Sequence, residues 1–283
     1  MALGIRYKDQ KNIFREKEGE TPFLSFRLLE DTKTVKHGFS TRLGGVSEGY
    51  YASLNLSFTR GDEERCVREN FRRIAGAIGV SCEDMVLSRQ THTTNVRKVT
   101  EADRGSGILY PASYTDVDGL ITDIPGICLV TSFADCVPLY FVDPVRKAIG
   151  LTHSGWRGTV GKIGKITVEK MQKEFGSDPK DIVAAVGPSI CQDCYEVSED
   201  VIERIRQNFE PSLWEKFFYR KPNGHYQLDL WKMNEEIFLE AGLLPEHIAV
   251  TNACTHCNPK VFYSHRAMGE QRGNLCAFLA LKE

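Results

Sequence analysis

Three side chains that often bind metal lie at the ends of short apolar runs in this chain. Cys136 and His153 flank two apolar runs joined by a turn at residues 143–144, and His92 follows the apolar residues 85–87. Strand ends beside flexible loops are where binding and catalytic sites are usually built. Two histidines and one cysteine suit zinc, and three protein ligands leave one coordination position open for water or substrate. We therefore expect a working zinc site formed by His92, Cys136 and His153.

The elements that position these ligands are expected to be strands interspersed with amphipathic helices. Apolar residues recur at helical spacing after Asp62, a suitable N-cap, and stop at Gly79. Further helices are expected at residues 161–175, 198–209 and 230–241. Because strands outnumber helices and often adjoin as hairpins, the pattern predicts an α+β fold of mixed β-sheets covered by helices. The expected strands are residues 23–26, 95–99, 118–122, 127–133, 138–142, 148–153, 182–186, 248–251, 261–263 and 275–281.

The composition is that of an ordinary soluble globular protein. The chain has 283 residues, of which 41% are hydrophobic and 26% charged, and we expect a single domain over residues 1–283 with residues 1–20 as a polar N-terminal extension. The net charge of -2 gives no reason to expect nucleic acid or a membrane as partner. The start of the chain lacks the apolar segment of a signal peptide. Nine cysteines are sparse for this length and favour a reducing compartment, so we expect a cytoplasmic protein. No long apolar heptad or exposed amphipathic stripe demands a partner, so we expect a monomer.

Four cysteines form two C-x-x-C pairs, Cys191 with Cys194 and Cys254 with Cys257. This spacing brings two sulfurs to one metal, so two such pairs can form a structural zinc site of four thiolates. The interval between the pairs is longer than in a usual zinc ribbon. The default expectation is therefore four reduced thiols, with a second metal or a disulfide as the alternative.

Seven short motifs, in a fixed order, resemble those of a known family. Together they are similar to the YfiH, or laccase-domain, family over roughly residues 37–281, and several ordered motifs are more specific than any one alone. The resemblance implies a YfiH-like fold and zinc bound by His92, Cys136 and His153. Cys191 stands where the family often has glycine, so its pair is expected to be particular to this chain. The motifs are H-G-F-S-T-R-L-G-G-V-S (37–47), R-Q-T-H (89–92), D-V-D-G-L-I-T (116–122), A-D-C-V-P-L (134–139), H-S-G-W-R-G (153–158), G-P-S-I-C-Q-D-C-Y-E-V (187–197) and Y-S-H-R (263–266).

The resemblance also implies an enzyme that acts on purine nucleosides. Members of the family cleave adenosine, inosine, guanosine and methylthioadenosine with phosphate, and they deaminate adenosine. Zinc suits deamination, because it lowers the pKa of a bound water to about 7 and so provides a nucleophile for C6 of the purine. Phosphorolysis needs, in addition, an anion site beside the ribose. The expected partners are thus purine nucleosides and phosphate, and the expected cofactor is zinc.

Three arginines in glycine-containing loops are expected to bind substrate. The guanidinium groups of Arg42, Arg157 and Arg266 offer a bidentate fork for phosphate, and nearby backbone N–H groups would add to an anion nest. Ser40, in the same motif as Arg42, is expected to contact substrate, and Arg42 is also expected to take part in catalysis. Asp135 is expected to orient a ligand or to act as general acid or base, with a turn cap as the alternative.

Three other functions are compatible with the same residues. A metal-free amide hydrolase, acting on a peptidoglycan precursor or a similar amide, would use Cys136 as nucleophile and His153 as base. A copper polyphenol oxidase, the activity behind the laccase name, is disfavoured because the chain has no H-x-H pair and only Met85 and Met268 lie near the motifs. A non-catalytic binding protein, in which zinc only staples the fold, would need a closed shell of four ligands.

Overall fold

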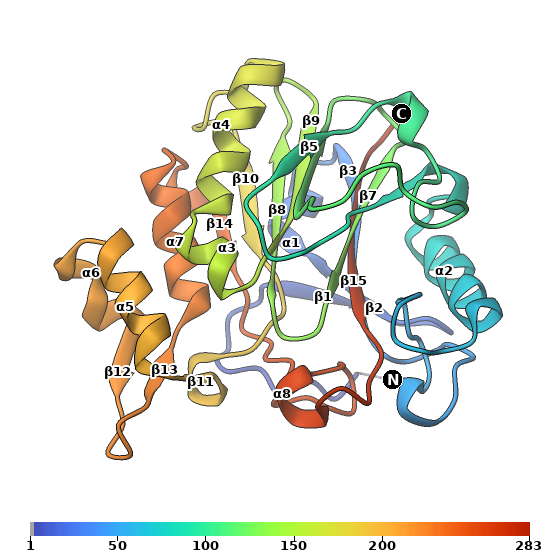
Figure 1. Ribbon diagram of the computed structural model, residues 1–283. Coiled ribbons are helices and arrows are strands. Elements are labelled where there is room, and N and C mark those ends of the chain that lie inside the picture. Colours follow the sequence, from blue (N-terminus) through green and yellow to red (C-terminus); the bar gives the residue numbers. More distant parts are fainter. Residues whose placement is uncertain (1–2) are drawn as a thin grey trace.

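The longest apolar runs of the sequence form strands that are buried on both faces. In β8 (Val137–Asp143), Tyr140 points into one hydrophobic core, while its neighbours Leu139 and Phe141 point into another. Successive side chains of a strand point to opposite faces, so a run that is apolar at every position must lie between two packed layers. The computed structural model, which describes residues 3–283, has this layered arrangement (Figure 1).

Two six-stranded sheets enclose the central core between them. The first has the strand order β1-β2-β3-β15-β7-β4, and the second has the order β14-β10-β8-β9-β6-β5. Both sheets are mixed, because β4–β7, β5–β6 and β10–β14 are parallel pairs among antiparallel ones. The strands of the first sheet are β1 (Phe14–Lys17), β2 (Phe23–Phe26), β3 (Val35–Ser40), β15 (Leu275–Leu281), β7 (Cys128–Phe133) and β4 (Met85–Leu87). Besides β8, those of the second are β14 (Ile248–Val250), β10 (Val183–Val186), β9 (Ala148–Ser154), β6 (Gly119–Thr122) and β5 (Val96–Lys98).

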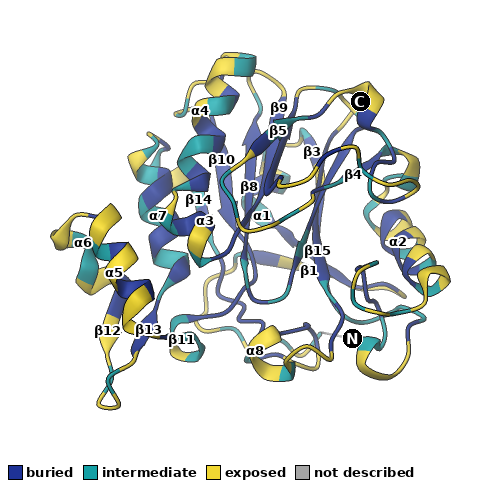
Figure 2. Ribbon diagram, in the orientation of Figure 1, coloured by how far each residue is buried: buried dark blue, intermediate teal, exposed yellow. Residues whose placement is uncertain are grey.

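Helices cover the outer faces of the two sheets. In α2, Val67, Phe71 and Ile74 recur at helical spacing and pack against the outer face of the first sheet. Helices α4 and α7 cover the outer face of the second sheet, with their exposed sides turned to solvent (Figure 2). The helices are α1 (Arg27–Asp31), α2 (Glu64–Ile78), α3 (Trp156–Val160), α4 (Ile163–Phe175), α5 (Glu199–Asn208), α6 (Pro211–Phe217), α7 (Leu230–Glu240) and α8 (His265–Met268), with 3-10 turns at Gly49–Tyr51, Cys82–Asp84, Glu101–Asp103, Gln192–Cys194 and Pro245–His247.

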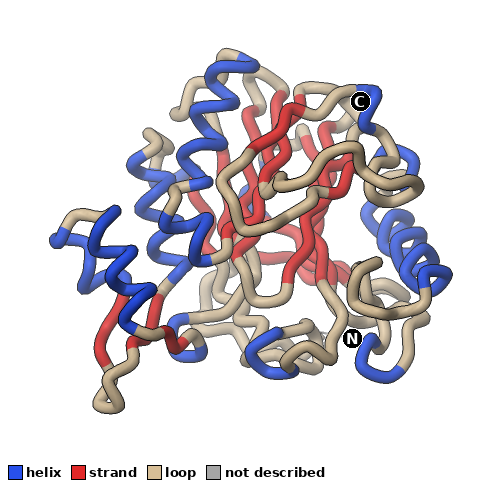
Figure 3. The backbone as a smooth tube through the Cα atoms, in the orientation of Figure 1, coloured by secondary structure: helices blue, strands red, loops and turns tan. Residues whose placement is uncertain are grey.

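A third, three-stranded sheet lies beside α7, and helices α5 and α6 lie next to this sheet. Its strand order is β11-β13-β12, with bounds Glu196–Val197, Tyr226–Leu228 and Phe218–Arg220. Figure 3 shows this unit set apart from the two large sheets at the centre of the molecule. The expectation of an α+β fold with helix-covered mixed sheets is confirmed.

Two local predictions are wrong. Residues 261–263 form a turn instead of a strand, because the backbone N–H groups of Val261 and Phe262 both donate to the carbonyl of Asn258. Asp62 does not cap α2, whose N-cap is Glu63; the carboxylate of Asp62 instead accepts hydrogen bonds from nearby loop side chains.

The helix expected at residues 161–175 is shorter and has a separate turn before it. The short helix α3 ends at Val160, and Lys162 adopts a left-handed conformation with φ of 56° before α4 begins. Of the expected N-terminal extension, residues 1–2 lie outside the described part of the chain, and Phe14–Lys17 forms the edge strand β1. Within residues 3–283, every helix is too short or too polar to cross a lipid bilayer.

His37, on β3, is a buried histidine that takes part in the fold as a neutral group. Its Nε2 accepts a hydrogen bond from the backbone N–H of Phe26 at 2.8 Å, which links β3 to the end of β2. Burial penalises the imidazolium and lowers the pKa of His37 from 6.5 to about 4. Neutral His37 therefore makes its full contribution to the stability of the fold when the pH is above the pKa of this side chain in the unfolded chain. This contribution is lost as the pH falls from 6.5 towards 4.

We predict that His37 makes the protein sensitive to mild acid. Between about pH 7.5 and about pH 5, the free energy of unfolding should fall by about 2 kcal/mol more in the wild type than in His37→Gln, whose amide oxygen can accept the same bond without titrating. Urea unfolding of both proteins at the two pH values measures this difference. Equal losses in both proteins would show that His37 does not titrate in this way.

Candidate metal centre and its cavity

Three ligand positions from separate parts of the chain meet at the end of the second sheet. Cys136 directly precedes β8, and His153 lies on the neighbouring strand β9 opposite Pro138. His92 belongs to the loop that follows β4. The Cys136 Sγ lies 3.9 Å from the Nε2 of His92, and the possible ligand atoms of all three residues lie within 4.8 Å of one another. The structure thus brings together the three side chains that the sequence analysis selected.

A buried carboxylate, Asp118, holds two of these ligands in place. Its side chain is completely buried at the start of β6. One oxygen bonds to Nδ1 of His153 at 2.8 Å and to the backbone N–H of His92 at 3.1 Å. The other accepts from the backbone N–H groups of Thr91 and Thr93, both at 3.0 Å, and from the Thr93 hydroxyl. Asp118 therefore fixes the loop that carries His92 and leaves Nε2 of His153 as its ligating atom.

The protonation states of these groups depend on one another. Burial raises the pKa of Cys136, but the charge of His153 and hydrogen bonds from both imidazoles outweigh it and lower that pKa to about 6. Burial lowers the pKa of His153, yet Cys136 and Asp118 raise it to about 9. Burial also raises the pKa of Asp118, but its donors hold it at about 2. At neutral pH this gives a thiolate next to an imidazolium, whose proton a metal ion would displace.

Asp135 holds the third ligand from the other side. This residue is 8% exposed and has a left-handed backbone, with φ of 86°. Its carboxylate accepts hydrogen bonds from the hydroxyls of Thr255 and Ser264, at 2.6 and 3.0 Å, and from the backbone N–H of Arg266 at 2.7 Å. Its bonding partners come from distant loops, and it directly precedes Cys136. This arrangement suits a residue that positions a ligand.

A cavity of about 700 Å³ opens in front of the three ligand positions. His92, Cys136 and His153 all line it, and its volume is typical of small-molecule sites. Part of its wall is formed by Leu109 and Tyr110, which are 41% and 47% exposed. Such an apolar wall next to polar side chains suits a small molecule that has both an apolar face and polar groups.

One arginine in this cavity is well placed to bind an anion. The side chain of Arg272 is 4% exposed, and its Nη1 donates to the carbonyl of Gly273 and the side chain of Asn274. Its Nε is buried without a hydrogen-bond partner. Burial lowers the pKa of Arg272 to about 10, which keeps it charged at neutral pH. A buried cation is stabilised by a nearby negative charge, so this arginine favours an anionic ligand in the cavity. The arginines that line the cavity are Arg60, Arg68, Arg89 and Arg272.

Arg42 lies elsewhere and uses its guanidinium to hold the backbone. Its Nε and Nη2 donate to the carbonyl of Ala52 at 2.9 and 2.7 Å, and its Nη1 donates to that of Pro259 at 2.8 Å. The guanidinium also lies 4.6 Å from the ring centre of Tyr263. Among the described residues, the lining of the cavity does not include Arg42.

The other expected substrate contacts also lie outside this lining. Arg266 donates to the carbonyls of Cys194 and Glu196, and exposed Arg157 lies 4.4 Å over the ring of Trp156. The buried Ser40 hydroxyl accepts from a backbone N–H of β15. In the described chain, the cavity wall is thus built from residues other than Ser40, Arg157 and Arg266.

Sequence reasoning missed Asp118 and Arg272. For Asp118 a signal existed, because the motif D-V-D-G-L-I-T places a carboxylate directly before a wholly apolar strand, where a buried charge needs several donors. For Arg272 no local signal exists, because charged groups near it, such as Arg60 and Asp135, lie far away in the sequence.

Known proteins resemble this chain along nearly its whole length. The purine nucleoside phosphorylase YlmD of Bacillus subtilis (strain 168) is 37% identical over 255 residues, covering 90% of this chain and 91% of YlmD. The adenosine deaminase RL5, from an unknown prokaryotic organism, is 35% identical over 256 residues, covering 88% of this chain and 96% of RL5. The crystal structure of the hypothetical protein YfiH from Bacillus licheniformis superimposes with a TM-score of 0.90 at 36% identity, covering 96% of this chain and all of YfiH.

The family model described as multi-copper polyphenol oxidoreductase laccase matches residues 36–282, which is most of the chain. With relatives of this identity along nearly its whole length, the chain belongs to the YfiH, or laccase-domain, family.

Proposed function

We propose that this chain is a zinc-dependent purine nucleoside enzyme that phosphorolyses adenosine, inosine, guanosine and methylthioadenosine and deaminates adenosine. The observation that carries the proposal is a set of two histidines and one cysteine on the wall of a cavity of about 700 Å³. Relatives named for each of the two activities support it. We further propose that the protein works as a cytoplasmic monomer on small molecules, without nucleic acid or membrane as partner.

The space around the three ligands fits a bound metal ion. Gly155 lies against them, and a Cβ at this position would be 2.8 Å from the Cδ2 of His92 and 3.1 Å from the Sγ of Cys136. The missing side chain therefore leaves room for these ligands to approach each other. When bound, zinc would supply a Lewis acid and a water activated at neutral pH.

The residues of the cavity supply the remaining requirements. Leu109 and Tyr110 give the purine an apolar surface, and Arg272 offers the charge that a phosphate dianion needs beside the ribose. In phosphorolysis, positive charge develops on the ribosyl group as the base leaves, so an anion held next to it lowers the barrier. Asp118 and Asp135 act as positioning residues. Asp118 bonds to His153 and to the backbone of His92. The carboxylate of Asp135, the residue before Cys136, is held by distant segments of the chain.

The metal-free amide hydrolase is the second candidate, and one observation favours it. The contacts run from a nucleophile, Cys136, to a base, His153, and on to an orienting carboxylate, Asp118. The pKa of Cys136 is lowered to about 6, which favours the nucleophilic thiolate. The other two alternatives have less support. A non-catalytic zinc protein would need a closed shell of four ligands, but among the described residues only three form this group. A copper oxidase would need an axial ligand such as methionine, but Met85 and Met268 have other contacts.

We predict that adenosine gives different products with and without phosphate. Zinc-loaded protein should form inosine in both conditions, and adenine with ribose 1-phosphate only when phosphate is present. His92→Ala should slow both reactions by at least about 100-fold, because the bound metal lowers the activation barrier of each reaction by several kcal/mol. Mass analysis of the products gives both rates, and exposed His225→Ala is the matched control. Full activity of zinc-stripped protein would instead favour Cys136 as a nucleophile.

We predict that Gly155→Ala loses zinc while Gly158→Ala keeps it. The added methyl group at position 155 meets His92 and Cys136, whereas a Cβ at position 158 has its nearest contacts at 3.5 Å. Elemental analysis of both variants, compared with far-ultraviolet circular dichroism, separates metal loss from unfolding. Normal zinc occupancy in a folded Gly155→Ala protein would mean that the ligands close in a different way.

We predict that Arg272, and not Arg42, supports phosphate-dependent cleavage. Arg272→Lys should reduce phosphorolysis of adenosine by about 10- to 100-fold and deamination much less, because only phosphorolysis binds phosphate and lysine lacks the bidentate fork. Arg42→Lys is the matched variant, and it should change both rates by a similar factor. A selective loss of phosphorolysis in Arg42→Lys would restore Arg42 as the phosphate ligand.

A further inference from the structure

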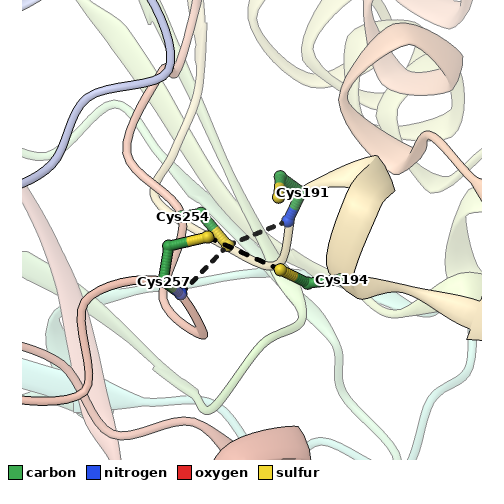
Figure 4. Close-up of side chains that lie close together, drawn as sticks. All are labelled: Cys191, Cys194, Cys254 and Cys257. Carbon is green, nitrogen blue, oxygen red and sulfur yellow. Dashed lines mark hydrogen bonds between the residues drawn. The ribbon is translucent and has the colours of Figure 1, made fainter.

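The two C-x-x-C pairs, far apart in the sequence, meet in one cluster. Strands β10 and β14 are parallel neighbours, so their carboxyl ends lie at the same edge of the second sheet. Cys191 and Cys194 lie in the segment after β10, and Cys254 and Cys257 lie in the segment after β14. Figure 4 shows their side chains turned towards one another, and the four sulfurs lie within 4.8 Å of one another.

The distances between these sulfurs fit a shared metal ion. The Sγ atoms of Cys194 and Cys257 lie 3.5 Å apart. With a Zn–S bond of about 2.3 Å, two sulfurs of a tetrahedral site lie about 3.8 Å apart. A disulfide bond would bring two sulfurs to about 2.05 Å, and all four residues are free cysteines. The spacing is therefore that of a four-thiolate site.

The surroundings of the cluster favour negatively charged sulfurs. The backbone N–H groups of Cys191 and Cys257 donate to the Sγ of Cys254, at 3.2 and 3.5 Å. The Lys8 ammonium, which bonds to Asp193 at 2.6 Å, also interacts electrostatically with Cys191 and Cys257. Four thiolates around a divalent ion carry a net charge of about -2, which these donors and this cation offset.

We propose that Cys191, Cys194, Cys254 and Cys257 bind a second zinc ion in a closed, structural site. Four protein ligands complete the tetrahedral shell and leave no position for water, so this zinc has no direct part in the reaction. The expectation of four reduced thiols is thereby replaced by four metal-bound thiolates. The proposal rests on this cluster alone and is independent of the enzyme's substrate.

The second zinc also stiffens the turn that carries Cys136. Thr255 lies between two of the cysteines and donates to the carboxylate of Asp135 at 2.6 Å. Ile190, next to Cys191, donates its N–H to the carbonyl of Asp135 at 3.1 Å. Both cysteine-bearing segments thus contact Asp135 directly. A zinc ion that joins these two segments therefore limits the motion of Asp135, which directly precedes Cys136.

The site further fastens the N-terminal segment to the core. The backbone N–H of Lys8 donates to the carbonyl of Asn252, and Tyr7 forms a β-bridge with Ala253. The side chain of Asn258 accepts from the backbone N–H of Arg6 at 2.7 Å. The segment around residues 252–258, which carries two of the proposed ligands, is therefore the surface on which the N-terminal segment is held.

Metal counting on the full-length protein tests the proposal. Wild-type protein purified under reducing conditions should contain about two zinc ions per chain, His92→Ala and Cys191→Ser about one each, and the double variant almost none. Half-buried Cys66→Ser is the matched control and should keep both ions. Cys257→His should also keep both, since imidazole can replace a thiolate, whereas Cys257→Ala should keep one.

A spectroscopic measurement identifies the ligands. In His92→Ala protein loaded with cobalt(II), the remaining ion should show strong thiolate-to-cobalt charge-transfer absorption in the near ultraviolet, and Cys191→Ser should weaken it. If Cys191→Ser does not fold, Cys257→His and Cys257→Ala give the same comparison. One zinc ion per wild-type chain, lost in His92→Ala and unaffected by the cysteine variants, would overturn the proposal. So would resistance of these four cysteines to alkylation in denaturant without reductant, because that result shows disulfides.

Discussion

The geometry of the candidate metal centre depends on the buried carboxylate of Asp118. A buried charge is stable only when hydrogen bonds and opposite charges replace its water shell. Asp118 obtains them from three successive backbone N–H groups, one hydroxyl and the imidazole of His153. The same bonds that stabilise the carboxylate therefore fix the loop of His92 and the ring orientation of His153. Asp118 lies at the start of β6, next to β9, so the second sheet sets the distance between these two ligands.

A second carboxylate has the same role on the other side of the site. Asp135 links the turn before β8 to segments near residues 255 and 264–266. His92 and Asp135 both have positive φ angles, 67° and 86°, a backbone conformation that costs on the order of 1 kcal/mol or more for residues other than glycine. Neighbouring hydrogen bonds hold these conformations in place. The ligands thus have little freedom to rearrange, although they lie in loops.

The sequence predicted the layers of the fold and the grouping of the three candidate ligands better than it predicted the residues that hold those ligands in place. Strands such as β8 and β9 follow from unbroken apolar runs, and His92, Cys136 and His153 follow from metal-binding side chains at strand ends. Arg272 shows the limit, because groups near it, such as Arg60 and Asp135, are brought there from distant parts of the chain and no local pattern records them. Arg42 shows the converse: its glycine-containing loop suggested an anion site, but backbone carbonyls at Ala52 and Pro259 occupy its donors. Which donors remain free depends on tertiary contacts.

An open metal site creates a mechanical problem that this fold resolves with polar contacts. A fourth protein ligand would make the centre rigid but would also close the position that substrate or water must use. Rigidity must therefore come from outside the coordination shell. Asp118 provides it for the two histidines and Asp135 for the cysteine. Asp135 is held by both segments that carry the four clustered cysteines and, in addition, by Ser264 and Arg266. The proposed four-thiolate centre and the proposed three-ligand centre would separate the two demands. The first would stabilise the loops, and the second would keep a free face towards the cavity.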